Sequence, residues 1–341
     1  MSIKITYYDL TSLDYSSFFL TGLLQNRKDF GYKLIISKKV PSILHDPAID
    51  VEWVKILFSI CLFKVELSNK EFYFCIDTRD SYKAAKDEGL GYHMPVLSKV
   101  RYYFKVNYRD EVIESDPNLK VYASKIIPIG PFFAIRPPVL LRFLPKIRHL
   151  RRFPSLEEIR NLRNVKKDLD IFFVVNFWGD RHAADNEFRY QIMKEVKRFP
   201  SVVSVTGFVT DGKLPERFAE FRCKQYSLKD FLRNVARAKV AIYVRGLHEC
   251  LSFKLGQLLA LGMPIVGQTI ANNKRLLYSN EHFASQFAFD DPKEIVQEAV
   301  KLLSEPERMQ MLGHANARTF DAKFTPQAVT AGTLKLIIND L

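Results

Sequence analysis

The chain has 341 residues, of which 47% are hydrophobic and 26% are charged. A length of this order suggests two domains, and the composition excludes an intrinsically disordered protein. Lysine and arginine number 51 and the acidic residues 38, which gives a net charge of +13. This surplus favours an anionic partner, such as nucleotide phosphates, an acidic membrane surface or nucleic acid, without choosing among them.

Four cysteines lie far apart in the sequence and form no Cys-x-x-Cys pair. This spacing argues against a zinc ribbon or a disulfide framework and favours a reducing compartment. The first residues run directly into a strand-like pattern rather than a secretory leader. The longest apolar run, residues 56–63, is much shorter than the roughly 18 residues of a membrane-spanning helix. We therefore expect a cytoplasmic protein.

Strand-like and helix-like segments alternate along most of the chain, which is typical of α/β layers built around parallel sheets. In the first half, an amphipathic stretch over residues 13–27 predicts a helix, and Gly31 ends it. The middle of this half is harder to assign from its pattern. The strands expected in this half lie at residues 3–8, 32–37, 71–76, 100–106 and 125–129.

The second half has a clearer pattern. Ser227 opens a helix with one apolar face, and Asp230 three residues later resembles a capping box. Gly262 and Pro264 are stop signals for a short helix before them, and the chain is mostly helical from Pro292 onward. The remaining predictions are strands at residues 169–176, 202–208, 240–244 and 265–266 and a helix at about 186–199.

The two halves meet where prolines cluster and the charge becomes strongly basic, near residues 131–154. We therefore predict a first α/β domain over residues 1–140 and a basic linker or helix over 141–167. A second α/β domain follows over 168–325. The last segment, 326–341, is expected to be a helix that can return to the first domain.

The most informative stretch of the sequence follows the strand that ends at Val244. A turn presents Arg245, His248 and Glu249, and a helix then begins at Ser252, a good N-cap. The free amides and positive dipole of such a helix start favour a bound phosphate. This pattern predicts an anion site with a neighbouring carboxylate that can accept hydrogen bonds from sugar hydroxyls.

This stretch resembles the donor-binding motif of GT-B-type glycosyltransferases. In that family a Glu is followed after seven residues by a second Glu, and then by a small residue, Gly-x-Pro and a strand. Here Glu249 and Gln257 have this spacing, and Gly262 and Pro264 complete the pattern. Gln257 replaces the second acid, although its amide can still bind a ribose hydroxyl, and Ser252 stands where many members carry Gly. The similarity covers roughly residue 168 to the C-terminus.

The resemblance implies an α/β fold with two Rossmann-like domains that face each other across a cleft. The nucleotide-sugar donor would lie in the second domain and the acceptor against the first. Gly179 and Arg181 would then contact the diphosphate, and Arg245 and Lys254 would neutralise the leaving group. Fixed cations and helix amides stabilise such charge without a metal. We expect no metal and no cofactor beyond the nucleotide-sugar co-substrate, because no Asp-x-Asp metal clamp is evident.

The catalytic candidates are Asp77, Glu249 and His248. Asp77 and Asp80 follow an expected strand on the acceptor side, where a carboxylate would deprotonate the acceptor hydroxyl in an inverting reaction. The alternative role is to cap a helix near Ser81. Glu249 and His248 also have an alternative as ordinary turn residues. The family motif leans towards a retaining reaction, and the sequence leaves the stereochemistry open.

A basic segment, Arg142 to Lys167, alternates cations with apolar residues. It can lie on an anionic membrane surface, which would suit a lipid-linked acceptor, or it can be an interdomain linker with a solvated basic face. Pro145 interrupts any long amphipathic helix there. Peripheral membrane binding and a linker role therefore both stay open.

The sequence is interpreted as a metal-independent glycosyltransferase that moves a sugar from a nucleotide-sugar donor to a hydroxyl of a glycan or lipid-linked acceptor. One alternative is a nucleotide-sugar epimerase or sugar phosphorylase of the same fold, and an epimerase would need no second substrate. Another is a non-catalytic basic protein that binds nucleic acid or membranes. We do not expect nucleic acid as a partner, because no DNA- or RNA-binding motif is found.

Overall fold

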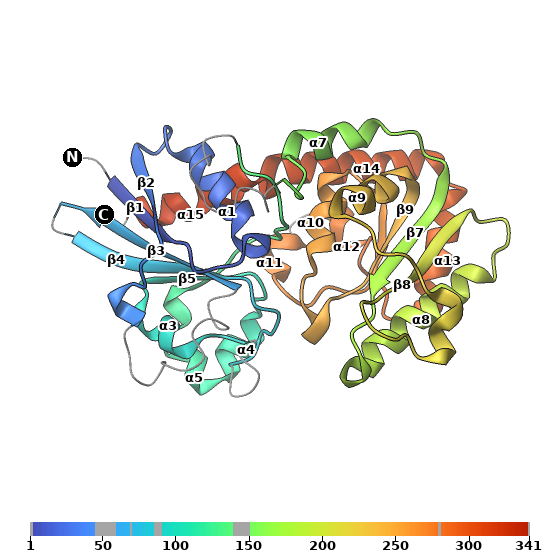
Figure 1. Cartoon of the computed structure of the whole chain (residues 1–341), viewed down its shortest axis with the longest axis horizontal. Coiled ribbons are helices and arrows are strands. Elements are labelled where there is room, and N and C mark those ends of the chain that lie inside the picture. Colours follow the sequence, from blue (N-terminus) through green and yellow to red (C-terminus); the bar gives the residue numbers. More distant parts are fainter. Residues whose placement is uncertain are drawn as a thin grey trace.

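The computed structural model describes residues 3–44, 59–68, 70–84, 91–138, 151–278 and 281–339. The chain forms two α/β domains that lie side by side along its long axis (Figure 1). Within these residues, the first domain has a sheet of six strands and the second a sheet of four. This arrangement confirms the predicted fold class.

The sheet of the first domain has the strand order β2-β1-β3-β4-β5-β6. It differs from the expected parallel sheet, because β3 runs antiparallel to both β1 and β4. Leu67 pairs with Lys70, so the turn between β3 and β4 has only two residues, and a turn this short joins antiparallel strands. The strands are β1 (Ile3–Tyr8), β2 (Tyr32–Ser37), β3 (Ile60–Leu67), β4 (Lys70–Asp77), β5 (Tyr102–Lys105) and β6 (Ile126–Pro128).

Helix α1 covers this sheet and agrees with the predicted helix over 13–27, with Gly31 in the left-handed region (φ 63°) just beyond it. The strand β3 was not predicted. The helices of the domain are α1 (Leu13–Asn26), α3 (Met94–Lys99), α4 (Asp110–Ser115) and α5 (Pro117–Lys120), with short 3-10 turns η1 (Ser42–Leu44) and η4 (Ala123–Lys125).

The sheet of the second domain is parallel throughout, in the order β10-β9-β7-β8. Its strands are β7 (Leu169–Asn176), β8 (Ser204–Val209), β9 (Ala238–Tyr243) and β10 (Ile265–Gly267). The helices are α7 (Leu156–Asn161), α8 (Ala183–Lys197), α9 (Leu228–Arg237), α10 (Phe253–Ala260), α11 (Lys274–Leu277), α12 (Glu281–Ala284), α13 (Pro292–Leu303), α14 (Pro306–Thr319) and α15 (Pro326–Ile338). Shorter turns are η6 (Leu162–Asn164), η7 (Asp180–His182), η8 (Glu216–Phe221), η9 (Leu247–Glu249) and the π-helical η10 (Phe320–Phe324).

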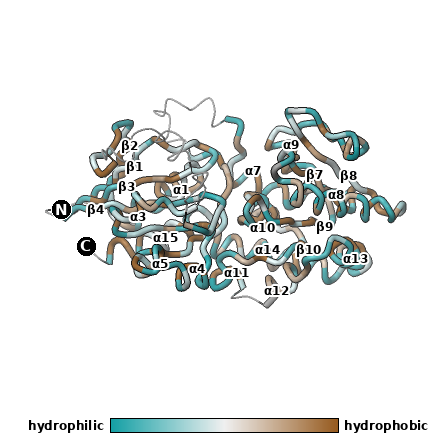
Figure 2. Tube along the Cα trace, turned by 90° about the horizontal axis from the view of Figure 1, so that it is seen from below, coloured by the Kyte–Doolittle hydropathy of each residue, from teal (hydrophilic) through white to brown (hydrophobic). Residues whose placement is uncertain are grey.

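The predicted helix at Ser227 is confirmed, and the Ser227 hydroxyl accepts a hydrogen bond from the Asp230 amide (3.1 Å). A hydrophobic core joins the two domains. It runs from strands β1, β3 and β4 through Phe132 and Phe133 to helix α10. Figure 2 shows hydrophobic segments mainly inside both domains and hydrophilic segments mainly on their outer loops.

The last helix, α15, leaves the second domain and lies against α1 of the first domain (Figure 1). The Asn26 amide donates hydrogen bonds to the Gln327 carbonyl and the Thr330 hydroxyl, both at 2.8 Å. The helices touch at Gly22, where an added Cβ would lie 2.0 Å from the Pro326 oxygen. Contact this close requires a residue without a side chain.

We expect Gly22→Ala to destabilise the protein by about 1–3 kcal/mol, because the new methyl group must push the two helices apart. The matched control is Gly332→Ala in α15, where an added Cβ meets no atom within 4 Å. That change should be neutral or stabilising by ~0.5–1 kcal/mol, since alanine favours helices over glycine. Urea unfolding followed by circular dichroism measures both. Equal stability of the two variants would contradict the close contact.

Candidate functional site

A cavity of about 590 Å³ lies between the two domains. Its size is typical of pockets for small organic ligands. The second domain contributes the carboxyl ends of β7 and β9 and the start of α10. The first domain contributes one wall. The residues of that wall are Tyr15, Thr78, Asp80 and Phe132.

The start of α10 supplies the first polar groups of the cavity. Ser252 is the N-cap, yet its hydroxyl makes no capping hydrogen bond. This hydroxyl oxygen is buried and has no partner among the described residues. The first turn of α10 also contains no acidic residue. A helix start with free amides and an unpaired hydroxyl favours a bound anion.

Two basic side chains, the partly buried Lys254 and the buried Arg189, lie beside this helix start. The Lys254 ammonium donates a hydrogen bond to the Val174 carbonyl (2.7 Å). Arg189, on α8, is only 4% exposed, and its guanidinium makes long hydrogen bonds to the carbonyls of Asn176 (3.3 Å) and Arg245 (3.4 Å). Both Arg189 and Lys254 line the cavity, and the hydrogen-bond partners that the described part of the chain gives them are carbonyl oxygens rather than acids.

The electrostatics of this pair are unfavourable without a ligand. Burial, and secondly the neighbouring charge of Arg189, lower the pKa of Lys254 to about 7. Burial also lowers the pKa of Arg189. Two like charges that are poorly accessible to water favour the binding of an anion, because the anion neutralises both. This end of the cavity therefore has the charge that an anion requires.

Arg189 was not among the residues predicted from the sequence. The helical spacing of the sequence nevertheless places it on the buried face of α8. This face consists of Asn186, Arg189, Ile192, Met193 and Val196. A single charged residue on a buried helix face indicates either a buried ion pair or a ligand contact.

Glu249 lies at the edge of the site and not in the lining of the cavity. Its carboxylate is 45% exposed and pairs with Arg109 of the first domain (2.7 Å) and with Arg245 (3.6 Å). The hydrogen bond from Arg109 lowers the pKa of Glu249. The structure therefore places Glu249 in an ion pair that links the two domains, and its contact with the donor stays a prediction.

The turn before α10 is held in an unusual backbone conformation. His248 and Glu249 both lie in the left-handed region, with φ of 54° and 61°. Consecutive residues in this region are strained unless surrounding contacts hold them. The His248 ring meets His182 edge-on at 5.9 Å between centroids, and its buried Nε2 has no partner among the described residues. Its catalytic role stays a prediction.

Of the remaining residues predicted to bind the donor, some line the cavity and others lie outside its lining. Gln257 is 6% exposed and lines the cavity, as does Arg245, whose guanidinium also pairs with Asp290 (3.3 Å). Gly179 is in the left-handed region (φ 73°) at the turn after β7, next to the cavity but outside its lining. The side chain of Arg181 lies outside the described part of the structure.

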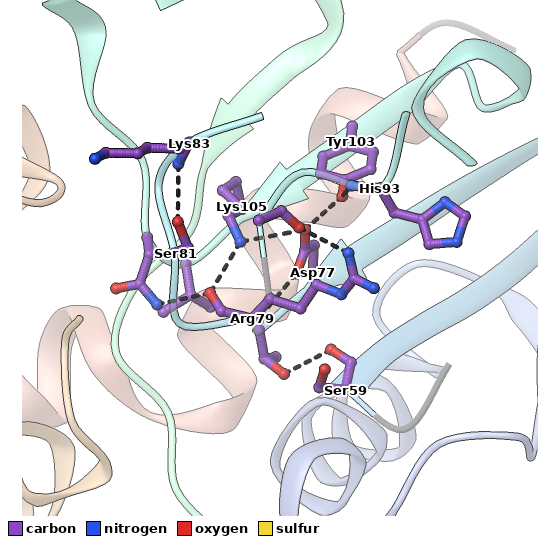
Figure 3. Close-up of polar contacts among 12 residues, drawn as sticks. Ser59, Asp77, Arg79, Ser81, Lys83, His93, Tyr103 and Lys105 are labelled. Carbon is purple, nitrogen blue, oxygen red and sulfur yellow. Dashed lines mark hydrogen bonds and ion pairs between the residues drawn. The ribbon is translucent and has the colours of Figure 1, made fainter. Parts of the chain in front are cut away.

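Asp77 lies in a buried network of polar contacts. It is fully buried at the end of β4, where it accepts hydrogen bonds from the Tyr103 hydroxyl and the Arg79 amide and pairs with Lys105 (3.2 Å). Figure 3 shows these contacts around its carboxylate. Asp77 is outside the lining of the cavity, whereas Asp80 is part of it. Both oxygens of Asp77 already have partners, and its role as a base stays a prediction.

Two further predictions concern other partners. Among the described residues, no group of His, Cys, Asp and Glu could hold a metal ion. Within the basic segment, residues 142–150 lie outside the described residues. The remainder includes Arg152, Arg160 and Arg163, which pair with acidic residues of the same chain. No helix within the described ranges is long and apolar enough to cross a membrane.

No family model matches the chain, and no curated protein matches its sequence. Among solved structures, S. aureus TarM has 8% identity and a TM-score of 0.47 over 77% of this chain and 50% of TarM. The UDP-GlcNAc 2-epimerase from Neisseria meningitidis has 9% identity and a TM-score of 0.43 over 78% of this chain and 68% of the epimerase. T4 phage BGT has 10% identity and a TM-score of 0.37 over 94% and 93%. The chain spans about half the length of TarM.

We expect the binding of inorganic sulfate, an anion that carries no proton at pH 8, to take up a proton at that pH. Lys254, with its pKa lowered to about 7, is mostly neutral at this pH, and a bound anion raises that pKa again. Calorimetry in two buffers of different ionisation enthalpy measures the uptake. It should disappear in Lys254→Met and persist in Lys239→Met, which removes a surface cation paired with Asp170. Binding without proton uptake would contradict the anion site at Lys254.

Proposed function

We propose that the protein is a glycosyltransferase that transfers a sugar from a nucleotide-sugar donor to a hydroxyl acceptor. The observation that carries the proposal is a pair of basic side chains, the buried Arg189 and the partly buried Lys254, which line the cavity without an acidic partner among the described residues. The start of α10 lies beside this pair. Together these groups suit a nucleoside diphosphate.

The transferred sugar requires a leaving group whose negative charge is stabilised as it develops. Arg189, Lys254 and the amides of α10 are fixed in place before the reaction, so they need little rearrangement to stabilise that charge. They supply positive charge that a metal supplies in other enzymes, which supports metal-independent transfer. Ser252 adds a hydroxyl that currently has no partner.

The rest of the donor has room in the same cavity. Gln257 reaches the cavity from α10 and suits a ribose hydroxyl, because its amide both donates and accepts hydrogen bonds. Trp178 is 43% exposed and lines the cavity, and Tyr226 lines it from the loop before α9. These aromatic rings offer surface for a nucleobase.

The acceptor would enter against the wall from the first domain. Aromatic rings of Tyr15 and Phe132 line it, and such rings suit the apolar face of a sugar. A glycan or lipid-linked acceptor agrees with this surface. Whether the basic segment brings the protein to an anionic membrane stays part of the proposal, because much of that segment lies outside the described residues.

Calorimetry with UDP, GDP, ADP and CMP, each with and without Mg²⁺, tests the donor site. We expect micromolar binding of one nucleoside diphosphate with no need for the metal. Lys254→Met should weaken it by about tenfold or more, since it removes a charge-assisted contact. Arg189→Lys should also weaken it, because an ammonium cannot reproduce the paired donors of a guanidinium. Lys239→Met should bind as the wild type does. If no nucleotide binds, the proposal is wrong.

Two further variants in the same experiment test Glu249. If Glu249 contacts the donor, Glu249→Ala weakens nucleotide-sugar binding while Arg109→Ala does not. If Glu249 acts through its ion pair across the cleft, the two variants have similar effects. Turnover of the nucleotide sugar without any acceptor, to an isomer rather than to free sugar, would instead identify an epimerase.

A further inference from the structure

We infer that Asp80 is the base that accepts the proton of the acceptor hydroxyl, and that the Cys250 thiol positions its carboxylate from across the cleft. This inference rests on the proposed function and deepens it. It also implies that the sugar is transferred with inversion at its anomeric carbon.

The first step is the place of Asp80 in the cavity. Asp80 follows β4 in the first domain and is half-buried in the cavity wall. The cations Arg189 and Lys254 line the same cavity from the second domain. A hydroxyl bound between Asp80 and the sugar would therefore attack from the first domain, while the diphosphate departs towards the second.

The second step is the contact that holds the carboxylate. Asp80 and Cys250, which belongs to the second domain, line the same cavity, and the interaction of the thiol with the carboxylate lowers the pKa of Asp80. Burial raises the pKa of the Cys250 thiol well above its usual range, so the sulfur keeps its proton and can donate it to the carboxylate. Cys250 lies next to the strained turn at His248 and Glu249. The turn that precedes α10 is thus connected directly to the proposed base.

The third step is the rigidity of the segment that carries Asp80. The Arg79 carbonyl accepts hydrogen bonds from Lys105 and from Asn107, both at 2.9 Å. The Arg79 guanidinium donates to the Gly91 carbonyl (2.8 Å), and the Thr78 amide donates to the Ser59 carbonyl (3.0 Å). Figure 3 shows part of this buried network. It holds the backbone on the N-terminal side of Asp80, and Asp77 belongs to it as a positioning residue.

The reaction step follows from these positions. The O–H bond of the acceptor breaks, and the electron pair of that oxygen forms the bond to the anomeric carbon. The bond from this carbon to the diphosphate oxygen breaks, and its electron pair leaves on the diphosphate beside Arg189 and Lys254. The proton passes to Asp80 and then to solvent. Entry and departure on opposite sides invert the anomeric carbon.

The acid–base properties of Asp80 agree with this role. Burial raises the pKa of its carboxyl, and a raised pKa makes a carboxylate a stronger base near neutral pH. The hydrogen bond from Cys250 and the charges of Lys105 and His248 oppose this effect, whereas Asp77 adds to it. Burial, and secondly the charge of Asp80, raise the pKa of Tyr15 to about 12, so its hydroxyl stays neutral.

Hydrolysis of nucleotide sugars tests the role of Asp80 without a known acceptor, because water then takes the acceptor's place. UDP-glucose, UDP-GlcNAc, GDP-mannose and ADP-glucose serve as probes. Asp80→Asn should lower turnover by about 10²–10⁴-fold and leave nucleoside diphosphate binding unchanged. Proton NMR at early times should show that an α-linked donor releases the β sugar. This second measurement needs only the wild-type protein, so it stands if the variant fails to fold.

The outcomes separate this inference from the proposed function. Release of the α sugar, or wild-type turnover by Asp80→Asn, overturns the base assignment and leaves the donor site standing. The same holds if the protein binds a nucleoside diphosphate but hydrolyses none of the four donors. Failure to bind any nucleotide overturns the proposed function itself.

The pH dependence of kcat/KM tests Cys250. Activity should fall as the pH decreases through the pKa of Asp80, because the protonated carboxyl cannot act as a base. Cys250→Ala removes a hydrogen bond that lowers this pKa, so its acid limb should move to higher pH. Cys250→Ser keeps a hydrogen-bond donor and should return the acid limb to its wild-type pH. An equal loss of activity at every pH, with no shift of the limb, would contradict the positioning role.

Discussion

The constraint on which the site depends is the placement of two basic side chains, the buried Arg189 and the partly buried Lys254, in one cavity without a carboxylate within ion-pair distance in the described structure. Such charges are costly away from water, and the chain reduces this cost with carbonyl oxygens rather than with acids. Val174 and Asn176, at the end of β7, supply two of these oxygens. A carbonyl holds a cation without cancelling its charge. The parallel sheet therefore presents that charge at the carboxyl ends of its strands, where ligands bind in open α/β sheets.

The second constraint is the contact between the domains, since the cavity has one wall from each. Neutral amides make much of this contact. Asn107 accepts hydrogen bonds from the Leu251 amide (2.8 Å) and from Asn272 (3.1 Å), and Asn273 donates to the carbonyls of Val106 (2.6 Å) and Ile129 (2.7 Å). Amides join the domains without adding charge to the cleft. They also fix the loop before α10, so the donor site depends on the first domain as well as on the second.

How much of this was predictable from the sequence depends on whether the signal was local. Helix α9 and the loop before α10 were predicted, because caps, glycines and apolar periodicity lie within a few residues of one another. Strand β3 was not, since its buried residues continue an apolar run with no turn signal at its start. Arg189 needed knowledge of which face of α8 is buried. The choice between Asp77 and Asp80 depended on Lys105 and Tyr103, which pair with Asp77 from a neighbouring strand.

Opposite charges lie on the two sides of the cleft. The second domain provides the cations, and the first domain provides the one carboxylate that the described cavity lining contains. In a displacement at a sugar carbon, negative charge grows on the leaving group while positive charge, as a proton, leaves the attacking hydroxyl. The carboxylate of the first domain therefore meets the departing proton, and the cations of the second domain meet the negatively charged leaving group. A carboxylate and a cation on neighbouring elements of one domain pair with each other, as Asp77 and Lys105 do in the first domain. Separation between two domains keeps the carboxylate and the cations available to the substrates.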